Sequence, residues 1–258
     1  MTLDHDEPSP DRRPTGTIGR RRVLATTGAA VGALWIAPSV LSYSAAAASS
    51  TLAGIIFTNP PVHIQGNAVK NVPPPTGTGT MWFLVVTETS QGNGTNALPM
   101  LTGPDVFTSP PVISSTPTGV DPYFGVWQSS STPSATGPTL QGNDTKGRWT
   151  ATIIGFSTGT QATLGTIGYA AAQPISLPGV TAPVASSWVF VGTASDGAGP
   201  SNWSTPAGYT KIIDFDGNNN TPPDLYIAEY PTVTTTAPGV VANFGAGQHA
   251  KGIIIGVG

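Results

Sequence analysis

The sequence repeats itself with a period of about one hundred residues, and this constrains the fold more than any other feature. Three pairs of segments align: 82–87 with 188–193, 121–127 with 224–230, and 152–156 with 253–257. Their offsets are 106, 103 and 101 residues. Small deletions in loops explain this drift, because loops accept changes of length that strands do not. A chain of this kind folds into two related sets of elements.

The repeated segments have the character of β-strands. They are short, rich in β-branched and aromatic residues, and bounded by Gly, Pro, Asn and Thr. A disordered stalk is the alternative that 32 Gly, 26 Pro and few charges suggest, but the apolar runs argue against it. We therefore expect an all-β protein. Its predicted fold is a jelly-roll-like antiparallel β-sandwich built from two sequence-related halves, at about 80–160 and 186–258.

The apolar patterns also predict where the strands lie. The opening and closing segments of each half are nearly continuous apolar runs, which predicts central strands buried between two sheets. The middle segments alternate, with Tyr226, Ala228 and Tyr230 on one face and Ile227 and Glu229 on the other. This pattern predicts a sheet that is half-exposed to water.

Two regions outside the aligned segments bear on the number of domains. Residues 51–80 precede the first half and have no evident counterpart before the second. The stretch 160–186 contains Pro174, Pro178 and Pro183, and it suits a crossover within one sandwich or a linker between two tandem domains. We expect one sandwich.

The N-terminal fifth of the chain reads as an export signal. Arg20 and Arg21 open a basic region, which is followed by the uncharged apolar stretch 25–41 and by an A-x-A cleavage site at 45–48. The arginine pair resembles the twin-arginine motif. We expect residues 1–48 to be a twin-arginine signal peptide and 49–258 to be the secreted protein.

An uncleaved membrane anchor is the alternative for this region, because 23–41 is about long enough to span a bilayer. Its Ala, Gly and Thr residues make it only weakly apolar, which favours the cleaved signal. After cleavage we expect no membrane segment. We expect the protein outside the cell, in the medium or at the cell surface.

Composition excludes several classes of protein. The chain has no Cys, which excludes disulfides and a lipoprotein anchor. The expected mature chain carries five basic and nine acidic residues, without a basic patch. We therefore do not expect the protein to bind nucleic acid.

Three short motifs carry a resemblance to a known family. They are Ile55-Ile56-Phe57, the Thr-Pro-Ala-Gly-Tyr segment at 205–209, and the Thr- and Pro-containing stretch 234–240. These resemble β-sandwich modules of actinobacterial surface proteins and of phage tail or capsid-decorating proteins, in which a Thr-Pro-Pro-Ala-Gly-Trp segment follows the first long strand. Here Tyr209 replaces the Trp of that family, and the first half keeps only the Leu-Thr-Gly-Pro of 101–104. The resemblance implies a jelly-roll-like sandwich in an extracellular or virion-surface setting, and it implies no catalytic residue.

Catalytic arrangements find little support in the sequence. His63 and His249 are the histidines of the expected mature chain, and no Gly-x-Ser-x-Gly segment accompanies them. A glycosidase needs two facing carboxylates, for which Glu88 with Glu229, or Asp121 with Asp224, are the candidate pairs. Asp121 and Asp224 occupy equivalent places in the two halves, which favours a shared turn role over distinct acid and base roles. We therefore expect that the protein is not an enzyme.

One segment is a candidate calcium site. Asp214, Asp216, Asn218 and Asp224 offer several hard oxygen ligands close together in the sequence, and such ligands suit Ca²⁺. The segment is not an EF-hand, because it lacks the bidentate Glu of that loop. A turn between two strands, with Asp, Gly and Asn at the positive-φ positions, is the favoured alternative. We expect no other cofactor.

Aromatic residues suggest where a ligand binds. Trp82 and Trp188 occupy the same place in both halves and are expected in the core. Trp203 lies in the predicted loop 201–204, so we expect Trp203, with Tyr209, to contact a ligand. Packing of Trp203 onto the end of the sandwich is the alternative.

These observations favour a secreted, non-catalytic β-sandwich that acts as a structural or carbohydrate-binding module. Its expected partner is a polysaccharide, the cell wall or another copy of the chain. A secreted hydrolase that acts on carbohydrate through Asp or Glu is one alternative. A phage-derived adhesin or decoration-type protein is the other, for which self-assembly is the discriminating observation.

Overall fold

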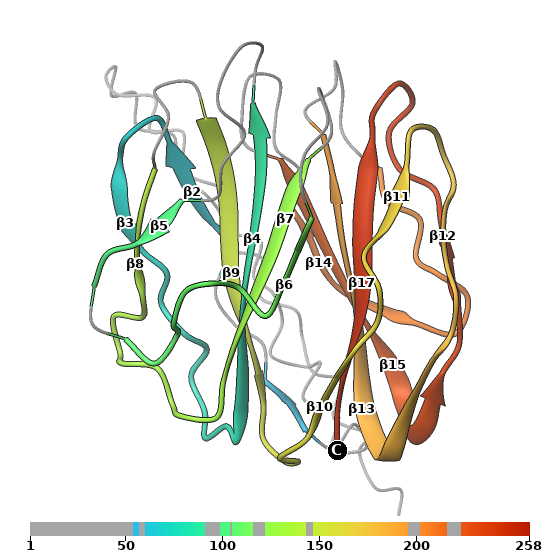
Figure 1. Ribbon diagram of the computed structural model, residues 1–258. Coiled ribbons are helices and arrows are strands. Elements are labelled where there is room, and N and C mark those ends of the chain that lie inside the picture. Colours follow the sequence, from blue (N-terminus) through green and yellow to red (C-terminus); the bar gives the residue numbers. More distant parts are fainter. Residues whose placement is uncertain are drawn as a thin grey trace, which may run out of the picture. The chain divides into compact units, whose positions relative to one another are not determined.

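The regular elements in the part of the chain that the computed structural model describes are all β-strands, joined by turns and loops (Figure 1). This part comprises residues 54–56, 60–90, 99–103, 105–115, 122–142, 147–195, 202–215 and 223–258, all within one compact unit, Ser44–Gly258. Every strand pair is antiparallel. The all-β prediction is confirmed. The expected signal peptide at 1–48 lies outside the described residues.

No helix in these ranges has the length and apolarity needed to cross a membrane.

The first half of the chain forms a large sheet and a small sheet. The large sheet has the order β1 (Ile55–Ile56), β9 (Gly147–Phe156), β4 (Met81–Ser90), β7 (Tyr123–Ser129) and β6 (Ile113–Ser115), and β2 (Val62–Gln65) also pairs with β9. The small sheet has the order β3 (Val69–Asn71), β8 (Thr139–Gln141) and β5 (Met100–Leu101).

The second half is built in the same order. Its large sheet runs β10 (Ala162–Leu164), β17 (Ala250–Val257), β13 (Val180–Ala194), β15 (Asp224–Ala237) and β14 (Thr210–Phe215), and β11 (Gly168–Ala170) also pairs with β17. Its small sheet pairs β12 (Ile175–Leu177) with β16 (Val240–Ala242). Each of these elements takes the place of a counterpart in the first half, where the small sheet has β5 as an additional strand.

The stretch 160–186 is therefore not a plain crossover or linker. It contains β10, β11, β12 and the start of β13, which occupy the places that β1, β2, β3 and β4 have in the first half. The expectation that 51–80 has no counterpart was wrong. Strands of two to four residues are too short to show an alternating pattern, and Pro and Gly between them read as loop.

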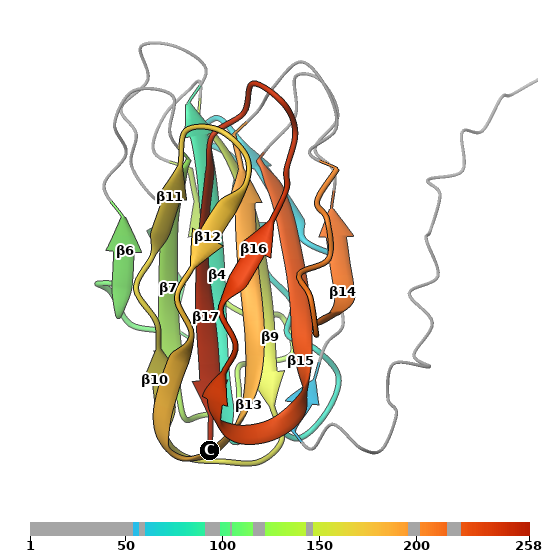
Figure 2. The same cartoon turned by 90° about the vertical axis from the view of Figure 1, so that its right-hand side faces the viewer.

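Three hydrophobic layers hold the four sheets together. Along β4, Met81, Phe83 and Val85 point into an inner core shared with Val189 and Val191 of β13. The alternate residues of β4 point into an outer core beneath the first small sheet, and those of β13 into a matching outer core beneath the second. Figure 2, turned from Figure 1, shows β13 and β17 behind the β12–β16 pair. The two large sheets thus pack face to face, as in a β-sandwich.

Burial on both faces confirms one strand prediction and corrects another. The opening strands β4 and β13 and the closing strands β9 and β17 are central in their sheets, as predicted. The middle strand β15 was expected to be half-exposed, yet 224–229 are buried and Tyr230 is half-buried. A small sheet covers its outward face, and no alternating pattern within one strand shows such a second layer.

Glycine and tryptophan meet at the same place in both halves. Trp82 on β4 pairs in register with Gly155 on β9, and Trp188 on β13 pairs with Gly256 on β17. A Cβ added to either glycine would collide with the indole ring beside it. Each ring therefore lies over a backbone hollow that only glycine leaves open.

Candidate functional site

The structure buries Trp203, which we expected at the surface. Its side chain is 5 % exposed. The ring stacks on Tyr226 with centroids 5.4 Å apart, and it also contacts Phe190 and Phe244. A Cβ on Gly192 would lie 2.7 Å from Cη2 of Trp203, so the ring fills a hollow above that glycine. The prediction of an exposed contact residue was wrong, and the packing alternative is the one observed.

Tyr209 is also a packing residue. It is 7 % exposed, and its hydroxyl donates a hydrogen bond of 3.0 Å to the carbonyl oxygen of Pro238. Burial raises the pKa of this phenol, and the nearby phenol of Tyr230 raises it further. Tyr209 is therefore buried, and the surface position expected of a ligand contact is not the one observed. Its buried, bonded hydroxyl instead fixes the segment 205–209 to the turn between β15 and β16.

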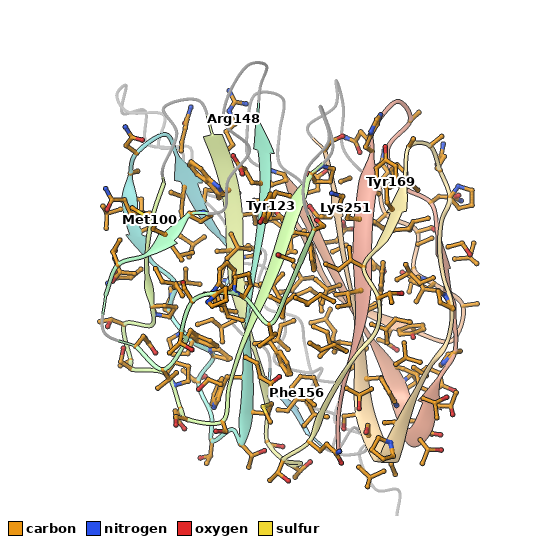
Figure 3. The ribbon with its side chains drawn as sticks, viewed as in Figure 1. Met100, Tyr123, Arg148, Phe156, Tyr169 and Lys251 are labelled. Carbon is orange, nitrogen blue, oxygen red and sulfur yellow. The ribbon has the colours of Figure 1, made fainter. Side chains whose placement is uncertain are left out.

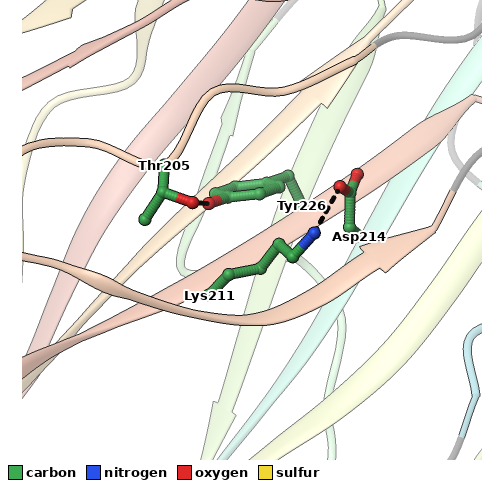
Figure 4. A network of polar contacts seen from close by, with 4 residues as sticks. All are labelled: Thr205, Lys211, Asp214 and Tyr226. Carbon is green, nitrogen blue, oxygen red and sulfur yellow. Dashed lines mark hydrogen bonds and ion pairs between the residues drawn. The ribbon is translucent and has the colours of Figure 1, made fainter.

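The described part of the candidate calcium site forms other contacts. Figure 4 shows the ammonium of Lys211 paired with Oδ2 of Asp214 at 3.1 Å, beside the hydrogen bond from the Tyr226 hydroxyl to Thr205. Asp224 is buried at the start of β15, where its carbonyl oxygen accepts a 2.8 Å hydrogen bond from Thr193. Asp216 and Asn218 lie outside the described residues. Within the described ranges, no three His, Asp or Glu residues gather to hold a metal.

The structure also separates one of the two candidate carboxylate pairs. By the alternation of side chains along a strand, Glu88 lies on the outward face of β4, the face that contributes to the outer core. Glu229 lies on the inward face of β15. Both are buried, and burial raises the pKa of Glu229. The two carboxylates therefore belong to different layers and do not converge on one substrate. Asp121, the partner proposed for Asp224, lies outside the described residues.

Two matched rows of side chains face each other between the large sheets, near the end where β4 finishes. The first row crosses β2, β9, β4, β7 and β6, and the second crosses β11, β17, β13, β15 and β14. The first consists of His63, Thr150, Thr87, Phe124 and Ser115. The second consists of Tyr169, Lys251, Thr193, Leu225 and Phe215. Cross-strand partners share a face, so each row lies on the inward face of its sheet.

One end of these rows is sealed, and we call it the closed edge. The ring of His63 lies 4.4 Å from that of Phe215, centroid to centroid, and Thr150 donates a 2.7 Å hydrogen bond to the carbonyl oxygen of Pro223. Nδ1 of His63 is buried and has no hydrogen-bond partner among the described residues. Burial lowers the pKa of His63, because the charged imidazolium loses its hydration there.

The burial of His63 at the closed edge predicts that the protein becomes less stable in acid. Since the folded state binds a proton more weakly than the unfolded state, the stability that neutral His63 confers is complete above pH 6.5. It is lost as the pH falls from 6.5 through the lowered pKa. We expect urea unfolding to show a smaller loss of free energy between pH 7 and pH 5 in His63→Phe than in the wild type. The same pH dependence in both proteins would contradict this role for His63.

The opposite end of the rows forms the open edge, made of Ser115, Tyr169, His249 and Lys251. The ammonium of Lys251 donates a 3.1 Å hydrogen bond to Oγ of Ser115, and it lies 6.0 Å from the centre of the Tyr169 ring. Figure 3 shows Tyr169 and Lys251 together near one end of β11 and β17. Lys251 is 4 % exposed and Tyr169 is 48 % exposed. Ser115 stands where the closed edge has Phe215, and the ring that contacts Tyr169 is that of His249, edge-to-face with centroids 5.9 Å apart.

Backbone and side-chain contacts hold the open edge in place. The hydroxyl of Tyr169 shares a 2.9 Å hydrogen bond with Nδ1 of His249. Two hydrogen bonds with Ser195 fix the backbone of His249. The backbone N–H of His249 donates to the Ser195 hydroxyl at 2.8 Å, and the backbone N–H of Ser195 donates to the carbonyl oxygen of His249 at 2.7 Å. The Tyr169 ring is therefore presented to solvent in a defined orientation.

Sequence reasoning missed the open edge because Tyr169 lies in the stretch taken for a crossover or linker. One signal was present in the repeat. The offset of 101 residues places Lys251 on Thr150, so a charged residue stands in one half where the other half is neutral.

Comparison with protein-family models, with curated proteins and with solved structures found no match to this chain.

Proposed function

We propose that the protein is a secreted, non-catalytic module that binds carbohydrate at its open edge. The observation that carries this proposal is the Tyr169 ring, the aromatic side chain with the greatest exposure in the part of the chain described here, at 48 %. Aromatic faces stack on the apolar faces of sugar rings, and few other surface groups do so. Tyr169 takes the role that the sequence assigned to Trp203 and Tyr209.

The surroundings of Tyr169 suit such a contact. The hydrogen bond to His249 holds the ring before any ligand arrives, so less side-chain freedom is lost on binding. Ser115 and His249 are half-buried beside it and offer a hydroxyl and an imidazole to sugar hydroxyl groups. A fixed ring flanked by polar groups is what oriented binding of a sugar requires.

The topology supports a jelly-roll-like arrangement within each half. In the first half the chain passes repeatedly between the two sheets: β3 lies in the small sheet between β2 and β4 of the large one, β5 between β4 and β6, and β8 between β7 and β9. The second half passes between its sheets at β12, which lies between β11 and β13 in the chain, and at β16, which lies between β15 and β17, while β13, β14 and β15 all belong to the large sheet. In a jelly roll, two Greek keys wrap across two sheets, and the chain passes between the sheets in this manner.

The setting we propose is the outside of the cell. The basic region at Arg20 and Arg21, the apolar stretch and the cleavage site at 45–48 support export through the twin-arginine pathway. A chain without Cys needs no disulfide chemistry after export. The proposed partner in that setting is a polysaccharide or the cell wall.

Retention on insoluble polysaccharides and bacterial cell walls tests the proposal. We expect the exported protein to be retained, and Tyr169→Ala to weaken binding by about tenfold or more because the stacking face is removed. Val241→Ala is the matched control, since Val241 is 60 % exposed on the second small sheet. Equal retention of Tyr169→Ala and the wild type would contradict the assignment of the site.

A further inference from the structure

We infer that the ligand of the open edge is an anionic glycopolymer, one whose repeating unit carries a carboxylate or a phosphate. This inference rests on the proposed binding of carbohydrate at Tyr169. Its basis is the ammonium of Lys251, which lies 6.0 Å from the centre of the Tyr169 ring. The first half has Thr150 at the same place.

The comparison of the two edges shows that the fold itself does not require a cation at this position. Thr150 occupies it in the first half, where its hydroxyl donates to the carbonyl oxygen of Pro223 and the side chain is fully buried. Lysine at the equivalent position places a buried ammonium between the two large sheets, where it donates to Ser115. A function at this edge explains why the second half carries the charge.

Electrostatics determine which sugars Lys251 favours. An ammonium close to an aromatic ring is attracted to the negative face of that ring and partly offsets its charge. The weakly positive C–H groups of a neutral sugar therefore gain less from stacking on the ring. An anionic group on a sugar stacked against Tyr169 lies within a Debye length of this cation, where screening by salt is incomplete. The pair of residues therefore favours an acidic sugar over a neutral one.

The rim of the open edge adds contacts that an anion uses. Ser115 accepts the hydrogen bond from Lys251, and a serine hydroxyl that accepts one hydrogen bond can also donate one. Ser115 is half-buried on the edge strand β6, beside the exposed ring. Cation, hydroxyl and ring thus come from β17, β6 and β11, which the packing of the two large sheets brings together.

The experiment compares polygalacturonate with its neutral methyl ester and with a mannan that carries phosphodiester groups, using the exported protein. We expect about tenfold tighter binding to an acidic polymer than to the methyl ester. The carboxylate and phosphate polymers, compared directly, identify the source of the anion. Raising the salt concentration should reduce the preference.

Two variants separate this inference from the proposed function. Lys251→Thr introduces the residue that the first half carries, so the fold is expected to persist, and the preference for acidic polymers should disappear. Tyr169→Ala should weaken binding to every polymer. Equal binding of the acid and its methyl ester by the wild type would overturn the inference and leave carbohydrate binding intact. Failure to bind any polysaccharide or cell wall would overturn both.

Discussion

Replacement of Trp203 by alanine is expected to lower the free energy of unfolding by about 3–5 kcal/mol. The ring is 5 % exposed, stacks on Tyr226 and fills the hollow above Gly192. Its removal leaves a cavity that the neighbouring aromatic rings close only in part. Denaturant unfolding of the wild type and Trp203→Ala, at one pH and salt concentration, measures the difference.

Tyr169→Ala is the matched control for this prediction. Its ring is about half exposed and its hydroxyl makes one hydrogen bond, so its loss should lower the free energy of unfolding by only about 1 kcal/mol. A Trp203→Ala protein of wild-type stability that fails to bind polysaccharide would contradict the packing role. It would return Trp203 to the ligand-contact role that the sequence suggests.

Replacement of Gly256 by alanine should destabilise the fold by about 2–3 kcal/mol. The new Cβ would lie 2.8 Å from Cη2 of Trp188 and closer still to other atoms of the indole ring. Trp188 cannot swing away freely, because its Nε1 donates a 2.8 Å hydrogen bond to the carbonyl oxygen of Thr234. Thermal or denaturant unfolding of Gly256→Ala measures the effect of this collision.

A double-mutant cycle with Trp188→Phe identifies the collision as the cause. A smaller ring leaves room for the methyl group, so the two substitutions together should cost less than their separate effects combined. Gly155→Ala should behave in the same way in the first half, since its Cβ would lie 2.6 Å from Cζ3 of Trp82. Strictly additive effects would show that the ring and the glycine are not coupled.

The strands that the sequence predicts well are those with continuous apolar runs. The runs at 82–86 and 253–257 became the central strands β4 and β17, because a strand buried on both faces has apolar residues on both. The alternation at 226–230 misled, since Glu229 is buried although its charge suggests exposure. What covers a strand depends on other parts of the chain, and the local pattern does not contain that information.

The same limit applies to the site. Trp203 is buried by Phe190, Tyr226 and Phe244, which the fold brings from three separate segments. The open edge joins Ser115 to Lys251, which are 136 residues apart. No local motif marks such a contact. Aligning the two halves further, through 160–186, would have placed Tyr169 on His63 and directed attention to this position.

The two edges of the sandwich also show what is gained by carrying both halves in one chain. In a dimer of identical single halves, every substitution would occur twice, and both edges would hold the same residues. Here each edge is encoded separately, so His63 and Phe215 seal one side while Tyr169 and Lys251 leave the other open. Covalent linkage thus allows one half of a near-symmetric structure to specialise without a matching change in the other.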